Sequence, residues 1–360
     1  MRLLRTVAVA AFLGGTSLAL FPSPQTGTAI EALRAKAETG DVQAQVKLGQ
    51  AYDSGAGVPQ DSALAAQWFR RAAESGDAEG QNSLGVMYRL GRGVPKDLTQ
   101  AQAWYRAAAK QGYAPALFNL GAAYYNGDGL RIDDAAAYAF FALAERAGSE
   151  EAKDAVRRGA AELSASQLRM AKMKLAELLD SGDEVPADPK AAVGVYRQLA
   201  EEGNATAQVK LATMLANGRG APQDTQAALQ WCEKAASQKF AGGFFCVGYL
   251  EESGVLGSPD YKQAAEWYRK AAEREYPLAM FLLGKMYAEG RGVRQDNIAA
   301  YMWLWLAKAS RVQGAAGELD ALSGRIAKGE AEKGTKKALE WINKKGSLAL
   351  QQRSAPPTRP

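Results

Sequence analysis

Residues 84–112 read LGVMYRLGRGVPKDLTQAQAWYRAAAKQG, and this stretch decides the fold. Its first half carries apolar residues at the i, i+3, i+4 spacing of one helix face, namely Leu84, Met87 and Tyr88. The Gly-Arg-Gly triplet that follows ends this helix, because glycine accepts the left-handed backbone of a helix C-terminus and of the turn beyond it. Residues 98–110 again have one apolar face, so the stretch predicts a hairpin of two helices.

The hairpin recurs along the chain in steps of 36 residues, and only the step from Leu120 to Leu175 is longer, by about 19 residues. The repeated leucine position is held by Leu48, Leu84, Leu120, Leu175, Leu211, Val247 and Leu283. In step with it follow Trp68, Trp104, Phe140, Val195, Trp231, Trp267 and Trp303. We expect Trp104 to fill the space between the two helices of its pair. The spacing thus predicts seven helix pairs, three before and four after an inserted segment.

A single pair cannot bury its apolar face alone, whereas stacked pairs can, so the chain is predicted to be an all-α solenoid. Extra helices are expected after repeats three and seven, at Ser149–Ala160 and within Gly314–Lys344. Ser164 and Gln167 fit a capping box at the start of the helix that follows the insertion.

These features divide the chain into a first module at residues 29–164 and a second module at residues 165–345. Each repeat also has an aspartate at the expected start of its second helix, such as Asp97, which suits an N-cap. Residues 346–360 contain three prolines and are expected to form a disordered tail.

Residues 1–19 have the pattern of a signal peptide. Arg2 and Arg5 precede an apolar stretch, and Ser17 and Ala19 supply the small residues that precede a cleavage site. The apolar stretch is shorter than the roughly 20 residues that span a membrane, although an uncleaved anchor is the alternative. We therefore expect a periplasmic or secreted protein with no stable membrane insertion after cleavage.

The composition excludes several classes of function. The chain has no histidine, which excludes histidine-based catalytic triads and histidine metal sites. Its net charge of +5 is modest for 360 residues and does not indicate nucleic-acid binding. The glycine turns lack the spacing of a phosphate-binding loop, and no acidic residues have the spacing of a calcium loop. We expect no catalytic residue, no cofactor and no metal.

The pattern LGxxYxxGxGV, followed by an aspartate, a tryptophan and an Ala-Ala pair, resembles the Sel-1-like repeat family. It is clearest in Leu84–Val94 with Asp97, Trp104 and Ala107-Ala108, and the resemblance covers about residues 29–309. The resemblance implies a right-handed α-solenoid similar to tetratricopeptide repeats. It also implies an adaptor in protein complexes, here a scaffold of the bacterial cell envelope that binds a protein or peptide partner.

Binding in helical solenoids usually uses the concave face, which is lined by the first helix of each pair. Several side chains there are aromatic, as a peptide-binding groove requires. The alternative is that the phenylalanines pack between neighbouring repeats. The candidate partner-binding residues are Asn82, Val86, Arg89, Phe118, Tyr125, Phe245, Tyr249 and Lys285.

An enzymatic function is the alternative to the scaffold. Some cysteine-rich relatives are reported to bind penicillin or to have weak β-lactamase activity, and they carry a cysteine pair in nearly every repeat. This chain has two cysteines in total, so it lacks the feature that carries that resemblance.

The two cysteines, Cys232 and Cys246, are predicted to form a disulfide. Each lies seven residues from the turn expected near Lys239, so both are at the same level of antiparallel helices. A bond closing this loop of about 15 residues stabilises by roughly 3 kcal/mol in the chain-entropy model. Two buried free thiols are the alternative, since Cys232 occupies a position that is otherwise bulky and apolar.

Overall fold

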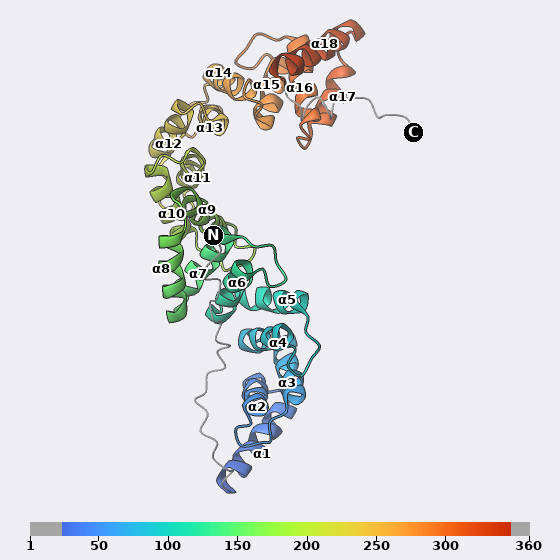
Figure 1. The fold of residues 1–360 in the computed structure, drawn as a ribbon. Coiled ribbons are helices and arrows are strands. Elements are labelled where there is room, and N and C mark those ends of the chain that lie inside the picture. Colours follow the sequence, from blue (N-terminus) through green and yellow to red (C-terminus); the bar gives the residue numbers. More distant parts are fainter. Residues whose placement is uncertain (1–23, 347–360) are drawn as a thin grey trace. The chain divides into compact units, whose positions relative to one another are not determined.

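The computed structural model describes residues 24–346, and every regular element in this part of the chain is a helix (Figure 1). The all-helical solenoid predicted from the repeat spacing is therefore confirmed. The helices are α1 (Pro24–Glu38), α2 (Val42–Ser54), α3 (Ser62–Glu74), α4 (Ala78–Leu90), α5 (Leu98–Ala109), α6 (Ala114–Asn126), α7 (Asp134–Arg146), α8 (Glu150–Glu162), α9 (Ala165–Ser181), α10 (Pro189–Glu201), α11 (Ala205–Ala216), α12 (Thr225–Ser237), α13 (Ala241–Ser253), α14 (Tyr261–Ala272), α15 (Pro277–Glu289), α16 (Asn297–Ala309), α17 (Ala315–Ser323) and α18 (Lys328–Lys345).

Each repeat contributes a first and a second helix, and the repeated aspartate caps the second one. In repeat two, Asp97 Oδ1 accepts hydrogen bonds from the backbone N–H groups of Thr99 at 2.9 Å and Gln100 at 3.0 Å. This satisfies two of the four donors that a helix N-terminus leaves without a partner. The first helices are α2, α4, α6, α9, α11, α13 and α15, and the second helices are α3, α5, α7, α10, α12, α14 and α16.

The described helices form two compact units, with the border between residues 195 and 196, inside α10. The repeat spacing predicts a border at 164/165, before α9. The difference arises because the inserted helix α8 and the following helix α9 both pack against α7, so the first unit continues through the insertion. The capping box at Ser164 and Gln167 is present as predicted.

In repeats one, two, three and six, the glycine after the repeated leucine position lets an aromatic ring of the second helix approach the first helix closely; in repeat seven Leu304 takes this place. A Cβ on Gly85 would lie 2.7 Å from the ring of Tyr105, which is fully buried. Phe69 and Tyr268 pack in the same way on Gly49 and Gly248. The residue after Trp104, and not the half-buried Trp104 itself, therefore fills the space between the paired helices.

The extra helices after repeat seven cover the last repeat of the second unit. Helix α18 packs against α16 and buries Ala338 and Ile342, while Trp341 meets Trp303 edge-on at 5.9 Å.

The expected signal peptide, residues 1–19, lies outside the described residues. Nearly all of the expected tail does too, and its first residue, Gly346, caps α18.

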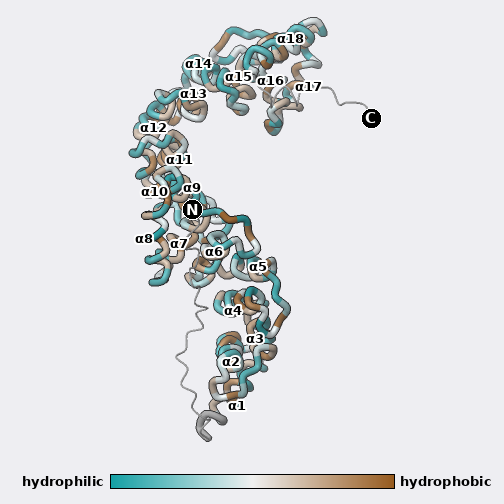
Figure 2. Tube along the Cα trace, in the orientation of Figure 1, coloured by the Kyte–Doolittle hydropathy of each residue, from teal (hydrophilic) through white to brown (hydrophobic). Residues whose placement is uncertain are grey.

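Apolar residues alternate with polar ones along the helices, which is typical of helices that each bury one face (Figure 2). Among the described residues, no helix is long and apolar enough to cross a membrane.

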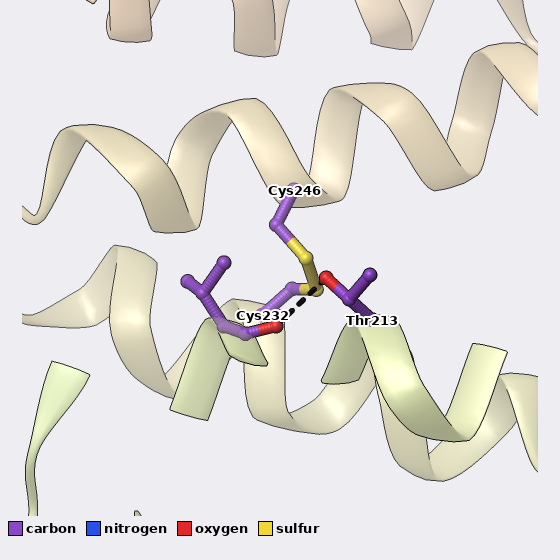
Figure 3. Close-up of a disulfide and its surroundings, with 4 residues drawn as sticks. Thr213, Cys232 and Cys246 are labelled. Carbon is purple, nitrogen blue, oxygen red and sulfur yellow. Dashed lines mark hydrogen bonds between the residues drawn. A yellow bond between two sulfur atoms is a disulfide. The ribbon is translucent and has the colours of Figure 1, made fainter. Parts of the chain in front are cut away.

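A disulfide joins Cys232 on α12 to Cys246 on α13, the pairing that the helix register predicts (Figure 3). The two Cα atoms are 5.5 Å apart and both cysteines are buried. Thr213 of α11 lies beside the bond, and its hydroxyl donates to the Val209 carbonyl at 2.9 Å.

Thiol counting tests this pairing directly. The purified chain, denatured without reductant, should react with no equivalent of a thiol reagent, because both sulfur atoms are bonded to each other. After reduction the same chain should react with two equivalents. Two reactive thiols before reduction would show that both cysteines are free.

Candidate partner-binding surface

The first helices of the first unit leave little of the predicted binding face open. Asn82 and Val86 are only 8% and 7% exposed, so the prediction that they line an open face is wrong for both. Asn119, one repeat later, donates through Nδ2 to Asn82 Oδ1 at 2.9 Å. The Asn82 side chain therefore joins two neighbouring repeats.

Phe118 and Tyr125 of α6 are half-buried. The Phe118 ring lies 5.2 Å from the ring of Phe141 on α7, the second helix of the same repeat, so this contact lies within one repeat and not between neighbouring repeats. Tyr125 packs in the same apolar cluster, to which the inserted helix α8 contributes Ala155 and Val156. The insertion thus covers part of the face that the repeat pattern alone would leave open.

Arg89 of α4 is half-buried beside the hydroxyl of Tyr105. Burial raises the pKa of Tyr105 to about 12, while the nearby Arg89 guanidinium acts in the opposite direction. The Nε atom of Arg89 is buried and has no hydrogen-bond partner among the described residues.

The first helices of the second unit present an open aromatic face. Tyr249 on α13 is 55% exposed at the position where Val86 is buried in the first unit. Its ring stacks on Phe245 at 6.3 Å, and Phe245 stacks on Tyr276 at 4.7 Å. Tyr249, Phe245 and Tyr276 thus form one continuous stack of aromatic rings.

Lys285 follows Tyr249 by one repeat and lies on α15. Its Nζ atom is 5.7 Å from the centroid of the Phe281 ring and 3.3 Å from a carboxylate oxygen of Glu318 on α17. Thr213, one repeat before Tyr249, is exposed on α11. The open face therefore has an aromatic centre with a hydroxyl and a cation on its two neighbouring first helices.

Sequence reasoning missed Tyr276, although a signal was available. It occupies the N-cap position that Asp41 and Asp77 hold in earlier repeats, and its side chain makes no capping hydrogen bond. Phe240 replaces the capping residue in the same way before α13. An aromatic residue at a position that favours aspartate or asparagine indicates a role other than helix capping.

Within residues 24–346, no group of three or more cysteine or acidic side chains is arranged to hold a metal ion. The arrangement that the structure does offer is a surface of aromatic and polar side chains, which suits the binding of another chain.

The repeats found by comparison with known proteins have nearly the same borders as the helix pairs of the structure. The model of the Sel1 repeat matches residues 42–77, 78–113, 114–149, 165–204, 205–240, 247–276 and 277–310. Among solved structures, a Sel1 repeat protein from Oxalobacter formigenes is 29% identical with a TM-score of 0.40, covering 82% of this chain and 80% of that one. A protective antigen of uropathogenic Escherichia coli strains that displays an SLR fold is 24% identical with a TM-score of 0.36, covering 93% and 91%. The search of curated proteins found no match. Because the repeat model matches most of the chain, the protein belongs to the Sel1 repeat family.

Proposed function

We propose that this protein is an interaction scaffold of the bacterial cell envelope, which holds a peptide or protein partner on the first helices of its second unit. The role as an interaction scaffold follows from the family, since the Sel1 repeat fold is a scaffold type for protein–protein interaction. The location is supported by the signal-peptide pattern of residues 1–19 and by the disulfide, because disulfides persist outside the cytosol.

The exposure of Tyr249 carries the choice of surface. A tyrosine ring that is 55% exposed leaves a large apolar area in water, and aromatic side chains of this kind dominate the binding energy at interfaces. The Tyr249 ring stacks on Phe245, which in turn stacks on Tyr276. A rigid aromatic side chain loses little conformational entropy when a partner binds.

Truncation of Tyr249 tests the surface. Tyr249→Ala should weaken the affinity for the co-purified partner by about 30-fold, as loss of a central aromatic contact does. The melting temperature should stay close to that of the natural chain, because the removed side chain is mostly exposed. Binding can be measured by calorimetry with the partner purified from the producing cells.

Met170→Ala is the matched control, because Met170 is 57% exposed on α9 of the other unit. It should bind the partner as the natural chain does. Equal loss of affinity in both variants, or unfolding of Tyr249→Ala, would show that Tyr249 is not the centre of a binding surface.

A further inference from the structure

A second surface of the second unit carries cations that lie on aromatic rings. The Nζ atoms of Lys234 and Lys270 are 3.9 Å and 3.7 Å from the ring centroids of Trp231 and Trp267, respectively. The Arg274 guanidinium is 4.6 Å from the Phe244 ring, which itself stacks on Trp267 at 5.9 Å.

These cations share one edge of the unit. Lys234 and Lys270 lie in the last turns of the second helices α12 and α14, and second helices of successive repeats end on the same side. Lys345, the last residue of α18, donates to the Glu273 carbonyl at the end of α14, at 2.7 Å. Its Nζ atom is also 5.6 Å from the Trp341 ring.

Two more cations occupy turn positions of this edge where the first unit has glycine. Lys239 and Arg311 have φ values of 59° and 61°, in the left-handed region that L side chains rarely adopt. The equivalent turns of the first unit use Gly40, Gly76, Gly112 and Gly148. The turn between Lys239 and Arg311 in this series holds Glu275, with a φ of 62°, so the left-handed non-glycine turns of this edge carry two cations and one anion.

We define Lys234, Lys239, Lys270, Arg274, Arg311 and Lys345 as the basic edge. All six side chains are exposed. The last turns and turn residues of the same helices also carry two carboxylates, those of Glu273 and Glu275, so the edge is clearly positive. Among the described residues of the first unit, one cation of a second helix lies over the tryptophan ring of its own repeat: Arg71 over Trp68.

We propose that the basic edge docks the second unit on a phospholipid surface that contains anionic headgroups. Clusters of four to eight Lys and Arg residues are attracted to such surfaces, at about 1 kcal/mol for each residue near the headgroups. Tryptophan beside these cations suits the boundary between headgroups and acyl chains. The cations are spread over four helix ends, which fits a planar partner with many charges better than one compact ligand.

The observations favour a lipid surface over a nucleic acid. Single-stranded nucleic acids bind by stacking bases on free aromatic faces. Here Lys234, Lys270 and Arg274 lie over the rings, so each ring already has a cation on one face. Charge attraction to headgroups needs no free ring face.

Replacing Lys239 and Arg311 by glycine removes two charges without destabilising the fold, so a loss of binding can be assigned to the lost charge. The full chain with Lys239→Gly and Arg311→Gly should melt at a higher temperature than the natural chain, because glycine relieves the positive φ. Its binding to vesicles of phosphatidylcholine mixed with phosphatidylglycerol should fall by about 30-fold, the loss expected for two cations. Vesicle co-sedimentation measures the binding, and vesicles of phosphatidylcholine alone should bind neither chain.

Lys96→Gln with Arg131→Gln removes two exposed loop cations from the first unit and is the matched control. This variant should bind the anionic vesicles as the natural chain does. The proposal is overturned if the natural chain does not bind anionic vesicles, or if both variants lose binding equally. It is also overturned if a single-stranded DNA probe binds more tightly than the vesicles and depends on the same two cations.

Discussion

Replacing Gly93 by alanine should destabilise the first unit by about 3–4 kcal/mol. Gly93 lies in the loop between α4 and α5 with a φ of 66°, and a Cβ there would overlap the backbone carbonyl of Ser62. Ser62 begins α3, so its carbonyl is fixed by the helix and cannot move away. The left-handed backbone and the overlap therefore both oppose the new side chain. Urea unfolding followed by circular dichroism at the helix band measures the effect.

Gly76→Ala separates these two causes. Gly76 also has a positive φ, of 90°, but a Cβ there meets no atom within 4 Å. This variant should lose only about 1 kcal/mol, the strain of the left-handed backbone. Equal losses at Gly76 and Gly93 would show that the close approach of the loop to α3 does not matter.

Removal of Arg92 should cost the first unit about 3 kcal/mol at neutral pH. Arg92 pairs with Asp53, whose side chain is only 1% exposed. Without the guanidinium, Asp53 would be a buried carboxylate with no cation to balance it. Arg92→Ala tests this by chemical unfolding. Arg291→Ala is the comparison, because its partner Glu252 is 17% exposed and also accepts a hydrogen bond from Tyr268 at 2.7 Å. We expect it to lose about half as much.

The effect of Arg92→Ala should depend on pH in a defined direction. Burial raises the pKa of Asp53 above its ordinary value, and Arg92 acts against that rise. The variant should therefore have a still higher pKa in the folded state. A carboxyl group with a raised folded-state pKa regains stability as the pH falls through that pKa. The stability difference between Arg92→Ala and the natural chain should shrink on acidification from neutral pH, and a constant difference would contradict this account.

The repeat architecture could be predicted from the sequence because its signals are local. The turn glycines, the capping aspartate at position 97 and the capping box at Ser164 each act within a few residues. The pairing of Cys232 with Cys246 also followed, because the register of two antiparallel helices depends only on their distance from the turn.

The state of the binding face could not be predicted in the same way. Whether Val86 or Tyr249 is exposed depends on side chains of other elements, and contacts between repeats join residues a whole repeat apart, such as Asn119 with Asn82. The border between the compact units differs from the border between the repeat modules because the spacing does not show which helix α8 and α9 contact. The contact of Gly85 with Tyr105 was missed because it joins two helices and not two neighbours in sequence.

Site-specific photocrosslinking in the producing cell tests the central claim, that a partner binds the open first-helix face of the second unit. A benzophenone-bearing amino acid would be placed at Tyr249 in one chain and at Met170 in another, since both side chains are mostly exposed. Illumination should give a discrete covalent adduct of one partner at position 249 and none at position 170. No adduct at position 249, or the same adducts at both positions, would contradict the claim.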